Sequence, residues 1–264
     1  MKPAPFDYRA PGSLDEALGL LGDESVVLAG GQSLVPLLNL RLARPELVVD
    51  INGLAELDYI RADDGPLQIG AMTRQVTLER SELVRERCPL LSAAVRLVGH
   101  PQIRARGTVG GSVAHADPAA ELPVVLTALG ARFHLRSPAG ERALDTSELF
   151  LGPLATAREP DELLVEIEVP EQPEGTGHGF AEHARTHGDF ATAGAAAVVG
   201  PGGAGIALLG AGPVPARAEA AERALAGGAA PAEAAALAAE SIEDDHRRAL
   251  CTELARRAIG EALA

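Results

Sequence analysis

The chain has 264 residues, 47% of them apolar but only 3% aromatic, so aliphatic side chains must fill the core of one large or two modest domains. Its formal charge of −14, with no basic stripe, argues against nucleic acids and anionic membrane surfaces as partners. The two cysteines, Cys88 and Cys251, lack CxxC spacing, which argues against a disulfide scaffold, a zinc site or an iron–sulfur cluster. We find no apolar signal region and no segment long enough to span a bilayer, so we expect a cytoplasmic protein.

Short strands and helices alternate in the first half of the chain. Ser13 and Glu16 have the spacing of a capping box and predict a helix over residues 13–21. Apolar patterning predicts further strands over 26–28, 47–51 and 67–71, and helices over 34–42, from about 73, over 90–98 and over 119–129. A hairpin is predicted over 131–136 and 142–144, followed by an alternating strand over 163–169.

A stretch rich in proline and glycine, residues 170–179, predicts a linker. Beyond it we predict strands over 179–183, 193–199 and 206–209, then helices over 217–225, 231–239 and 245–263. A GxG sequence at 210–212 follows a strand, but Pro213 and Pro215 favour a turn over a nucleotide-binding fingerprint. We therefore divide the chain into residues 1–175, in parts of about 1–53 and 54–175, and a C-terminal domain of residues 176–264.

Two glycine-bearing segments, Ala29-Gly30-Gly31-Gln32-Ser33 and Thr108-Val109-Gly110-Gly111-Ser112, are predicted to be loops that bind a phosphate group. Backbone N–H groups hold concentrated negative charge well, and glycine permits the positive φ angles and close approach that a cradle needs. The first segment follows a strand and precedes a helix, where such cradles occur. Neither segment matches the Walker A or GxGxxG pattern, and each is also compatible with a simple turn, so spacing alone leaves the ligand open.

Longer stretches around these glycines carry a family resemblance. The matching stretches are 29–34, 49–52, 69–73, 103–104 with 107–123, 150–153, and Arg185 with 188–191. In their order and spacing the chain resembles the FAD-binding medium subunits of molybdenum hydroxylases, the group of carbon monoxide, nicotine and xanthine dehydrogenases. This resemblance implies an α+β fold. A two-part FAD-binding domain of the p-cresol methylhydroxylase and vanillyl-alcohol oxidase type would precede a smaller C-terminal α+β domain, a short antiparallel sheet packed with helices.

The resemblance also implies which residues touch the cofactor. Both glycine segments would contact the FAD pyrophosphate, through Ala29, Gly30, Gly31, Gln32, Ser33 and Leu34 and through Thr108, Val109, Gly110, Gly111 and Ser112. His115 and Asp117 would line the cofactor path. Since a carboxylate repels a diphosphate, Asp117 either accepts from a sugar hydroxyl or caps the helix that follows Pro118.

Further along the chain, Glu121 is either an acidic residue that contacts the flavin or an exposed residue favoured by the helix dipole. Arg185, Asp189 and Phe190 belong to a segment that returns toward the isoalloxazine in the family, where Phe190 would cover the ring. By resemblance, members of the carbon monoxide dehydrogenase branch have a Tyr at that position. Phe190 has no phenol hydroxyl, so the hydrogen bond of such a group is lost here. Ala105 is a second departure, because Ile-Arg-Asn is common in the family.

By resemblance, the chain is a flavin-bearing electron-transfer subunit without catalytic side chains of its own. It would receive electrons from a small partner subunit with two [2Fe–2S] clusters, while a large molybdopterin subunit hydroxylates the substrate, in a dimer of heterotrimers. NAD, a quinone and oxygen stay open as acceptors. Two alternatives are a free-standing FAD-dependent oxidase, which usually has a larger substrate domain, and an assembly subunit that has lost FAD. No metal site is predicted, because the histidines lack metal-ligand spacing with carboxylates or thiolates; these are His100, His134, His178, His183, His187 and His246.

Overall fold

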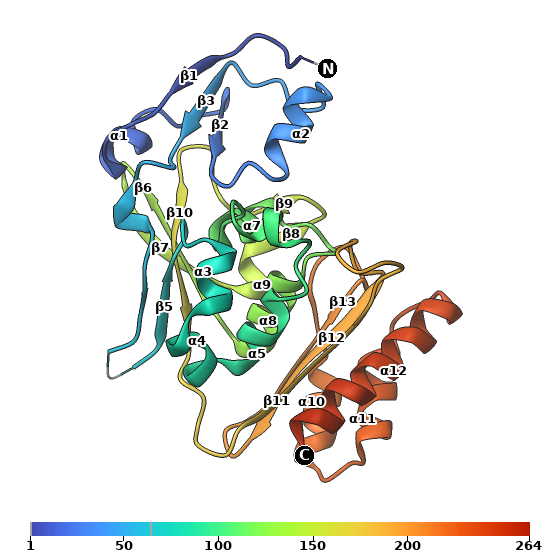
Figure 1. Ribbon diagram of the computed structural model, residues 1–264. Helices are drawn as coiled ribbons and strands as arrows, with labels where there is room; N and C mark the ends of the chain where they lie inside the picture. The colour runs from blue at the N-terminus through green and yellow to red at the C-terminus, as the bar shows by residue number, and fades with distance from the viewer. Residues whose placement is uncertain (1, 64) are drawn as a thin grey trace.

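Three larger β-sheets, each packed by helices, follow one another along the chain in the computed structural model, which describes residues 2–63 and 65–264 (Figure 1). The first is a parallel sheet in the order β1-β3-β2, made of β1 (Asp7–Arg9), β2 (Ser25–Leu28) and β3 (Leu47–Asp50). Parallel strands require crossover connections, and α1 (Leu14–Leu18) and α2 (Leu34–Asn39) supply them. The sequence did not predict β1, because its three residues are all exposed and form no apolar run.

Only half of the predicted capping box at α1 is present. The Ser13 side chain accepts a hydrogen bond from the Glu16 amide, as expected. The Glu16 carboxylate instead accepts from the amide of Gly12, at 2.8 Å, one residue before the expected donor. The helix still begins where Ser13 predicts, since one cap bond is enough to define its start.

The second sheet is antiparallel, in the order β4-β5-β10-β6-β7. Its strands are β4 (Ile60–Arg61), β5 (Leu67–Gly70), β6 (Arg132–Ser137), β7 (Gly140–Asp145) and β10 (Leu163–Val169). The predicted hairpin is confirmed, with Ser137 paired to Gly140 across the turn. A small two-stranded sheet joins β8 (Phe150–Gly152) to β9 (Ala155–Thr156).

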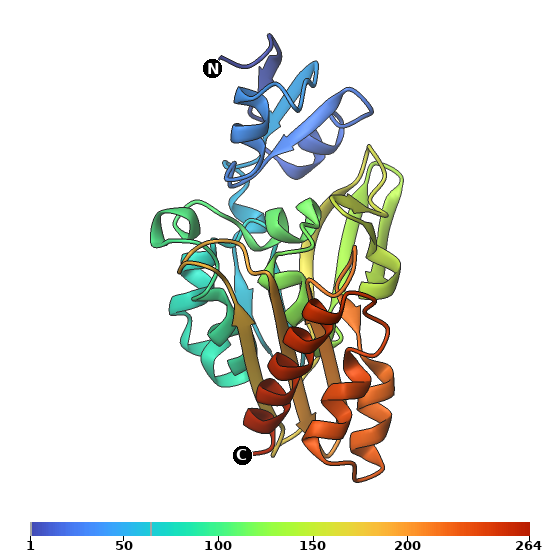
Figure 2. The same ribbon diagram turned by 90° about the vertical axis from the view of Figure 1, so that its right-hand side faces the viewer.

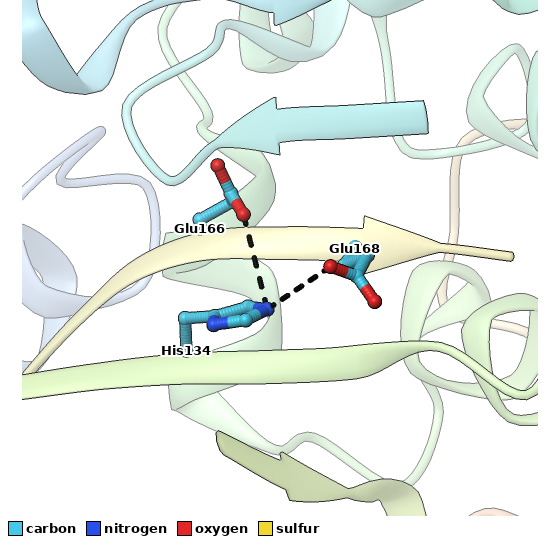
Figure 3. A group of neighbouring side chains, drawn as sticks. All are labelled: His134, Glu166 and Glu168. Atoms are coloured by element: carbon cyan, nitrogen blue, oxygen red, sulfur yellow. Dashed lines mark ion pairs between the residues drawn. The ribbon is translucent and has the colours of Figure 1, made fainter. Parts of the chain in front are cut away.

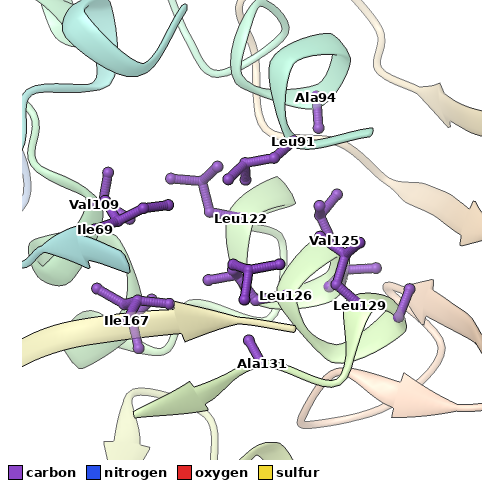
Figure 4. Close-up of a cluster of buried hydrophobic side chains, with 14 of the residues drawn as sticks. Ile69, Leu91, Ala94, Val109, Leu122, Val125, Leu126, Leu129, Ala131 and Ile167 are labelled. Atoms are coloured by element: carbon purple, nitrogen blue, oxygen red, sulfur yellow. The ribbon is translucent and has the colours of Figure 1, made fainter. Parts of the chain in front are cut away.

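Short helices fill the space beside the second sheet. They are α3 (Gln75–Arg80), α4 (Glu82–Arg87), α5 (Pro89–Val95), α6 (Pro101–Arg104), α7 (Val109–His115), α8 (Glu121–Leu129) and α9 (Thr146–Leu149), with a 3₁₀ turn at Ala55–Leu57. Every residue of α8 is buried, and Figure 4 shows Leu122, Val125 and Leu126 at the centre of the apolar core. A helix with no exposed face must be covered on all sides, which fixes its position firmly.

The third sheet, in the order β11-β12-β13-β14, covers α8 with one face and is covered by helices on the other (Figure 2). Its elements are β11 (Gly177–His183), β12 (Ala193–Gly200), β13 (Gly203–Leu209), β14 (Ala216–Arg217), α10 (Glu219–Ala226), α11 (Pro231–Ala238) and α12 (Asp245–Ala262). Along β12, Ala195 and Ala197 pack toward the helices, whereas Ala196 and Val198 join the core around α8. The alternation explains why the strand is apolar throughout, since both of its faces are buried.

The predicted linker is too long at its C-terminal end, because β11 already begins at Gly177. A Cβ at Gly177 would collide with the carbonyl oxygen of Ala262, and one at Gly179 with that of Ala258. These glycines therefore let α12 approach the strand closely rather than loosen the chain. The predicted helix over 217–225 likewise starts later, because Arg217 pairs with Ala207 in the sheet. The division of the chain at residues 175 and 176 stays a prediction.

Across residues 2–63 and 65–264, no helix combines the length and apolar character needed to cross a bilayer.

Substitution by alanine should have opposite effects on stability at two glycines, one packed against α12 and one within it. Gly179→Ala places a methyl group against the α12 backbone and should lower the free energy of unfolding by roughly 1–3 kcal/mol. Gly260→Ala lies within the helix with open space around it and should raise stability by about 0.5–1 kcal/mol. Urea denaturation of the two variants and the parent measures both shifts. Equal shifts in the same direction would contradict the close approach of α12 to β11.

Candidate functional site

The fold brings the two glycine-bearing segments into direct backbone contact. A Cβ built on Gly30 would lie 2.5 Å from the carbonyl oxygen of Arg106 and 2.7 Å from the Cα of Gly107. Real side chains do not tolerate such distances, so glycine is required at position 30. The first segment thus rests on the chain just before the second, as the predicted common site demands.

Two polar side chains brace this contact from behind. The Asn52 side-chain amide donates to the Ala29 carbonyl at 2.8 Å, and its oxygen accepts from the Arg74 guanidinium at 2.6 Å. Arg74 also donates to the carbonyl of Arg106. The Asn52 side-chain amide also donates to the Asp50 carboxylate. Burial raises the pKa of Asp50, but hydrogen bonds from Tyr8 and Asn52 together lower it more, so the pKa lies below its ordinary value. Arg74 was not predicted as a site residue, although it directly follows the stretch 69–73 that carried the resemblance.

The first segment presents unused backbone donors. Gly31 has a φ of +73°, and within the described residues no acceptor receives the amides of Gly30, Gly31, Gln32 or Ser33. The Gln32 side chain turns back and donates to the carbonyl of Gly30 at 2.9 Å. Successive free N–H groups around a left-handed residue form the kind of nest that binds anions.

The second segment is not the predicted loop but the start of helix α7. Thr108 caps this helix by accepting from the Gly111 amide at 3.1 Å. The amides of this first turn are occupied: those of Val109, Gly110 and Ser112 donate to the carbonyls of Thr73, Ala71 and Thr108. A Cβ at Gly110 would lie 2.7 Å from the Ala71 oxygen, so this glycine serves packing. The two segments therefore have different chemistry, contrary to the expectation that both are anion-binding loops.

A cavity of about 590 Å³ opens beside the two segments, within the size range of small-molecule and cofactor sites. Most of the predicted site residues line it: Ala29, Gly30, Gly31, Gln32, Ser33, Leu34, Thr108, Gly110, Gly111, Ser112, His115, Asp117, Glu121, Asp189 and Phe190. Val109 instead lies in the apolar core, and Arg185 is exposed and does not line the cavity. Lining residues that the sequence analysis did not predict include Gln75, Gly99, Ile103, Arg158 and Gly188.

Asp117 stabilises the turn that precedes α8. Its Oδ1 accepts from the Ala119 amide at 2.9 Å, while the N-cap position of α8 belongs to Ala120. The prediction that Asp117 caps the helix is therefore wrong, because Pro118 and the turn separate Asp117 from α8. The carboxylate still lines the cavity, and its contact with a sugar hydroxyl stays a prediction.

Glu121 is buried, with only 5% of its surface exposed, so the exposed-residue alternative is wrong. Burial raises the pKa of this carboxyl to about 7, and the nearby Glu182 and Asp117 carboxylates add to the rise. Burial also raises the pKa of Glu182 on β11 to about 7. In the described chain, Oε2 of Glu182 is buried without a hydrogen-bond partner. A carboxyl group in a cavity whose pKa is close to 7 can keep its proton near neutral pH and donate a hydrogen bond.

A separate cluster joins His134 of β6 to Glu166 and Glu168 of β10 (Figure 3). The His134 Nε2 lies 3.8 Å from Oε1 of Glu166 and 3.5 Å from Oε2 of Glu168, and the three offer possible ligand atoms within 4.8 Å. Sequence spacing did not reveal it, because pairing between strands brings the residues together. Glu166 also accepts from the hydroxyl of Tyr59 and the guanidinium of Arg61. The Nε2 atom of His134 is buried without a hydrogen-bond partner among the described residues, and we assign the cluster no metal.

Comparisons with known proteins show the family to which the chain belongs. Residues 4–172 match a family model described as the FAD binding domain in molybdopterin dehydrogenase. The chain is 39% identical to the carbon monoxide dehydrogenase medium chain of Hydrogenophaga pseudoflava, across 100% of this chain and 99% of that protein. It is 50% identical to the 6-hydroxypseudooxynicotine dehydrogenase complex subunit alpha of Paenarthrobacter nicotinovorans, over 75% of this chain and 68% of that one.

The fold is also that of a solved protein. The chain superimposes with a TM-score of 0.93 on a chain of the carbon monoxide dehydrogenase from Hydrogenophaga pseudoflava that lacks the Mo-pyranopterin moiety of the molybdenum cofactor. The two are 41% identical, and the match covers 100% of this chain and 99% of that chain. The predicted α+β fold, with an antiparallel C-terminal sheet packed by helices, is confirmed.

The buried Glu121 carboxyl should make stability depend on pH. Because its folded pKa of about 7 exceeds the ordinary value of about 4.3, the folded state loses stability as pH rises through this window. Glu121→Gln cannot ionise, so at about pH 8 it should be more stable than the parent by on the order of 1–3 kcal/mol, and at about pH 4 nearly equal to it. Urea denaturation across this pH range measures the difference, with the exposed Glu233→Gln as a matched control. Parallel curves for Glu121→Gln and the parent would show that Glu121 does not titrate in this window.

Proposed function

Because the chain belongs to the family of FAD-binding domains of molybdopterin dehydrogenases, we propose that it relays electrons from [2Fe–2S] clusters of a partner subunit, through FAD, to an external acceptor. The family resemblance predicted from the sequence is thereby confirmed. The chain is the FAD-binding subunit of an oxidoreductase complex. The observation that carries the proposal is the single cavity that joins the free amides of residues 30–33 to Glu121 and Phe190.

The residues around the cavity fit FAD. Its pyrophosphate needs N–H donors at close range, and the nest at Gly30 and Gly31 offers free amides without a Cβ in the way. Ser33 and Ser112 also line the cavity, and their hydroxyl groups would provide further donors. Asp117 would accept from a sugar hydroxyl rather than face the diphosphate.

At the flavin, the chain would control protonation and access rather than supply reactive groups. When bound, FAD supplies the exchange of one or two electrons. Protonated Glu121 would donate a hydrogen bond without adding negative charge beside the cofactor. Phe190 would cover the ring system at the cavity mouth.

Partner subunits would carry the remaining redox centres. The similarity to a medium chain supports a large and a small partner subunit. In our proposal the large subunit would hold the molybdopterin and the small one the iron–sulfur clusters, and the complex would be a dimer of heterotrimers. Cys88 and Cys251 are both buried in this chain, so neither is available to a cluster at its surface. Substrate oxidation would thus occur in another subunit, while electrons leave through the flavin.

The contact at Gly30 gives a direct test of the cofactor site. Gly30→Ala forces the two segments apart and should weaken FAD binding at least about tenfold. Gly53→Ala is the matched control, because nothing lies within 4 Å of its Cβ. Quenching of flavin fluorescence on titration gives both affinities, and circular dichroism shows whether each variant is folded. Unchanged FAD affinity in folded Gly30→Ala would mean that the contact does not shape the site.

The relay itself is tested in the assembled complex. In a Gly30→Ala complex washed free of FAD, substrate should still reduce the iron–sulfur clusters, seen by electron paramagnetic resonance, whereas turnover with an external acceptor should fall at least about a hundredfold. Added excess FAD should restore part of that turnover. Full turnover without FAD would overturn the relay. Reduction of flavin by a small substrate in the isolated chain would instead support a free-standing oxidase, and a parent chain that binds no FAD would support an assembly role.

A further inference from the structure

The loop of residues 184–192, which connects β11 to β12, extends from the C-terminal sheet to the cavity. Its Gly188, Asp189 and Phe190 line the cavity wall. The Thr192 amide donates to the His183 carbonyl at 2.7 Å and closes the base of the loop. Most of the loop is exposed, including Phe190 at 69%, so its position depends on the few contacts that it makes with the rest of the chain.

One of those contacts is with His100, whose neighbours Gly99 and Ile103 also line the cavity. The ring of His100, which precedes α6, fills the space where a side chain at Gly188 would begin. A Cβ built on Gly188 would lie 2.6 Å from Nδ1 and 2.7 Å from Nε2 of His100, and Gly188 has a φ of +87°. The loop backbone therefore rests directly on the imidazole.

A second ring completes the contact. The centroids of the His100 and His187 rings are 6.0 Å apart, with their planes at 63°, an edge-to-face arrangement. His100 thus touches two successive loop residues, His187 and Gly188. We call these three residues the His100 clasp.

The clasp joins two segments that both line the cavity. Gly99 and Ile103 flank His100 and belong to the lining, as do Asp189 and Phe190, which follow Gly188. We infer that His100 is a positioning residue, which holds the 184–192 loop closed so that Phe190 shields the bound flavin from solvent. This inference rests on the proposed flavin site. It adds that His100 controls the solvent exposure of the bound flavin.

The first test uses the full chain loaded with FAD. His100→Ala removes an exposed side chain and leaves the core intact, and it should increase quenching of flavin fluorescence by iodide about threefold as the open form of the loop gains population. The affinity for FAD should change less, because the nest at Gly30 and Gly31 is untouched. His100→Phe keeps a ring against Gly188 and should restore most of the shielding. His246→Ala, an exposed histidine on α12, is the matched control and should match the parent.

A double-mutant cycle separates the clasp from a general loosening of the loop. Gly188→Ala pushes a methyl group into the His100 ring and should also raise iodide quenching. Adding His100→Ala removes that collision, so the double variant should be quenched less than the sum of the two single effects. Strictly additive effects, or His100→Ala with parental quenching, would overturn the clasp while FAD binding stands. A parent chain that binds no FAD would overturn the proposed function and the clasp with it.

Discussion

The site depends on one steric constraint: the backbone at Gly30 touches the backbone at Arg106 and Gly107 without room for a Cβ. This contact fixes the end of β2 against the segment that leads into α7. It thereby joins the N-terminal parallel sheet to the part of the chain that packs beside the second sheet, β4-β5-β10-β6-β7. Asn52 and Arg74 hold the contact from behind by binding the carbonyls of Ala29 and Arg106. Hydrogen bonds to a charged guanidinium are worth more than neutral ones, so the brace resists separation of the two segments.

The same constraint divides the work between the two glycine segments. Residues 30–33 keep their amides free because the chain turns there through the positive φ of Gly31 and has not yet entered α2. The amides of 109–112 are already bound, since Thr108 caps α7 and Gly110 packs on Ala71. The first segment therefore offers free donors to an anion, while the second supplies a close-packed wall that includes Ser112.

Local patterns predicted much of the fold but little of how its parts meet. The hairpin over β6 and β7 and the alternating strand β10 follow from periodicity and turn residues, which are properties of neighbours in sequence. The glycines at 177 and 179 misled the linker prediction, because a close helix and a flexible turn both favour glycine. Arg74, the burial of Glu121 and the pairing of His134 with Glu166 all depend on contacts between distant segments, which spacing does not encode. The resemblance identified most cavity residues because it carried tertiary information that the pattern lacks.

The C-terminal sheet does more than cover the core, because it also supports Glu121 and the 184–192 loop, which both contribute to the cavity lining. Helix α8 begins with Glu121 in the cavity and packs the rest of its length against β12 and β13. The same sheet carries Glu182 on β11, whose carboxylate adds to the rise that burial causes in the pKa of Glu121, and it extends the 184–192 loop toward His100. Since β12 is buried on both faces, a shift of this sheet would disturb the cores on its two sides at once. Its alanine-rich packing thus fixes the two strand ends from which the 184–192 loop extends, relative to the Glu121 carboxyl.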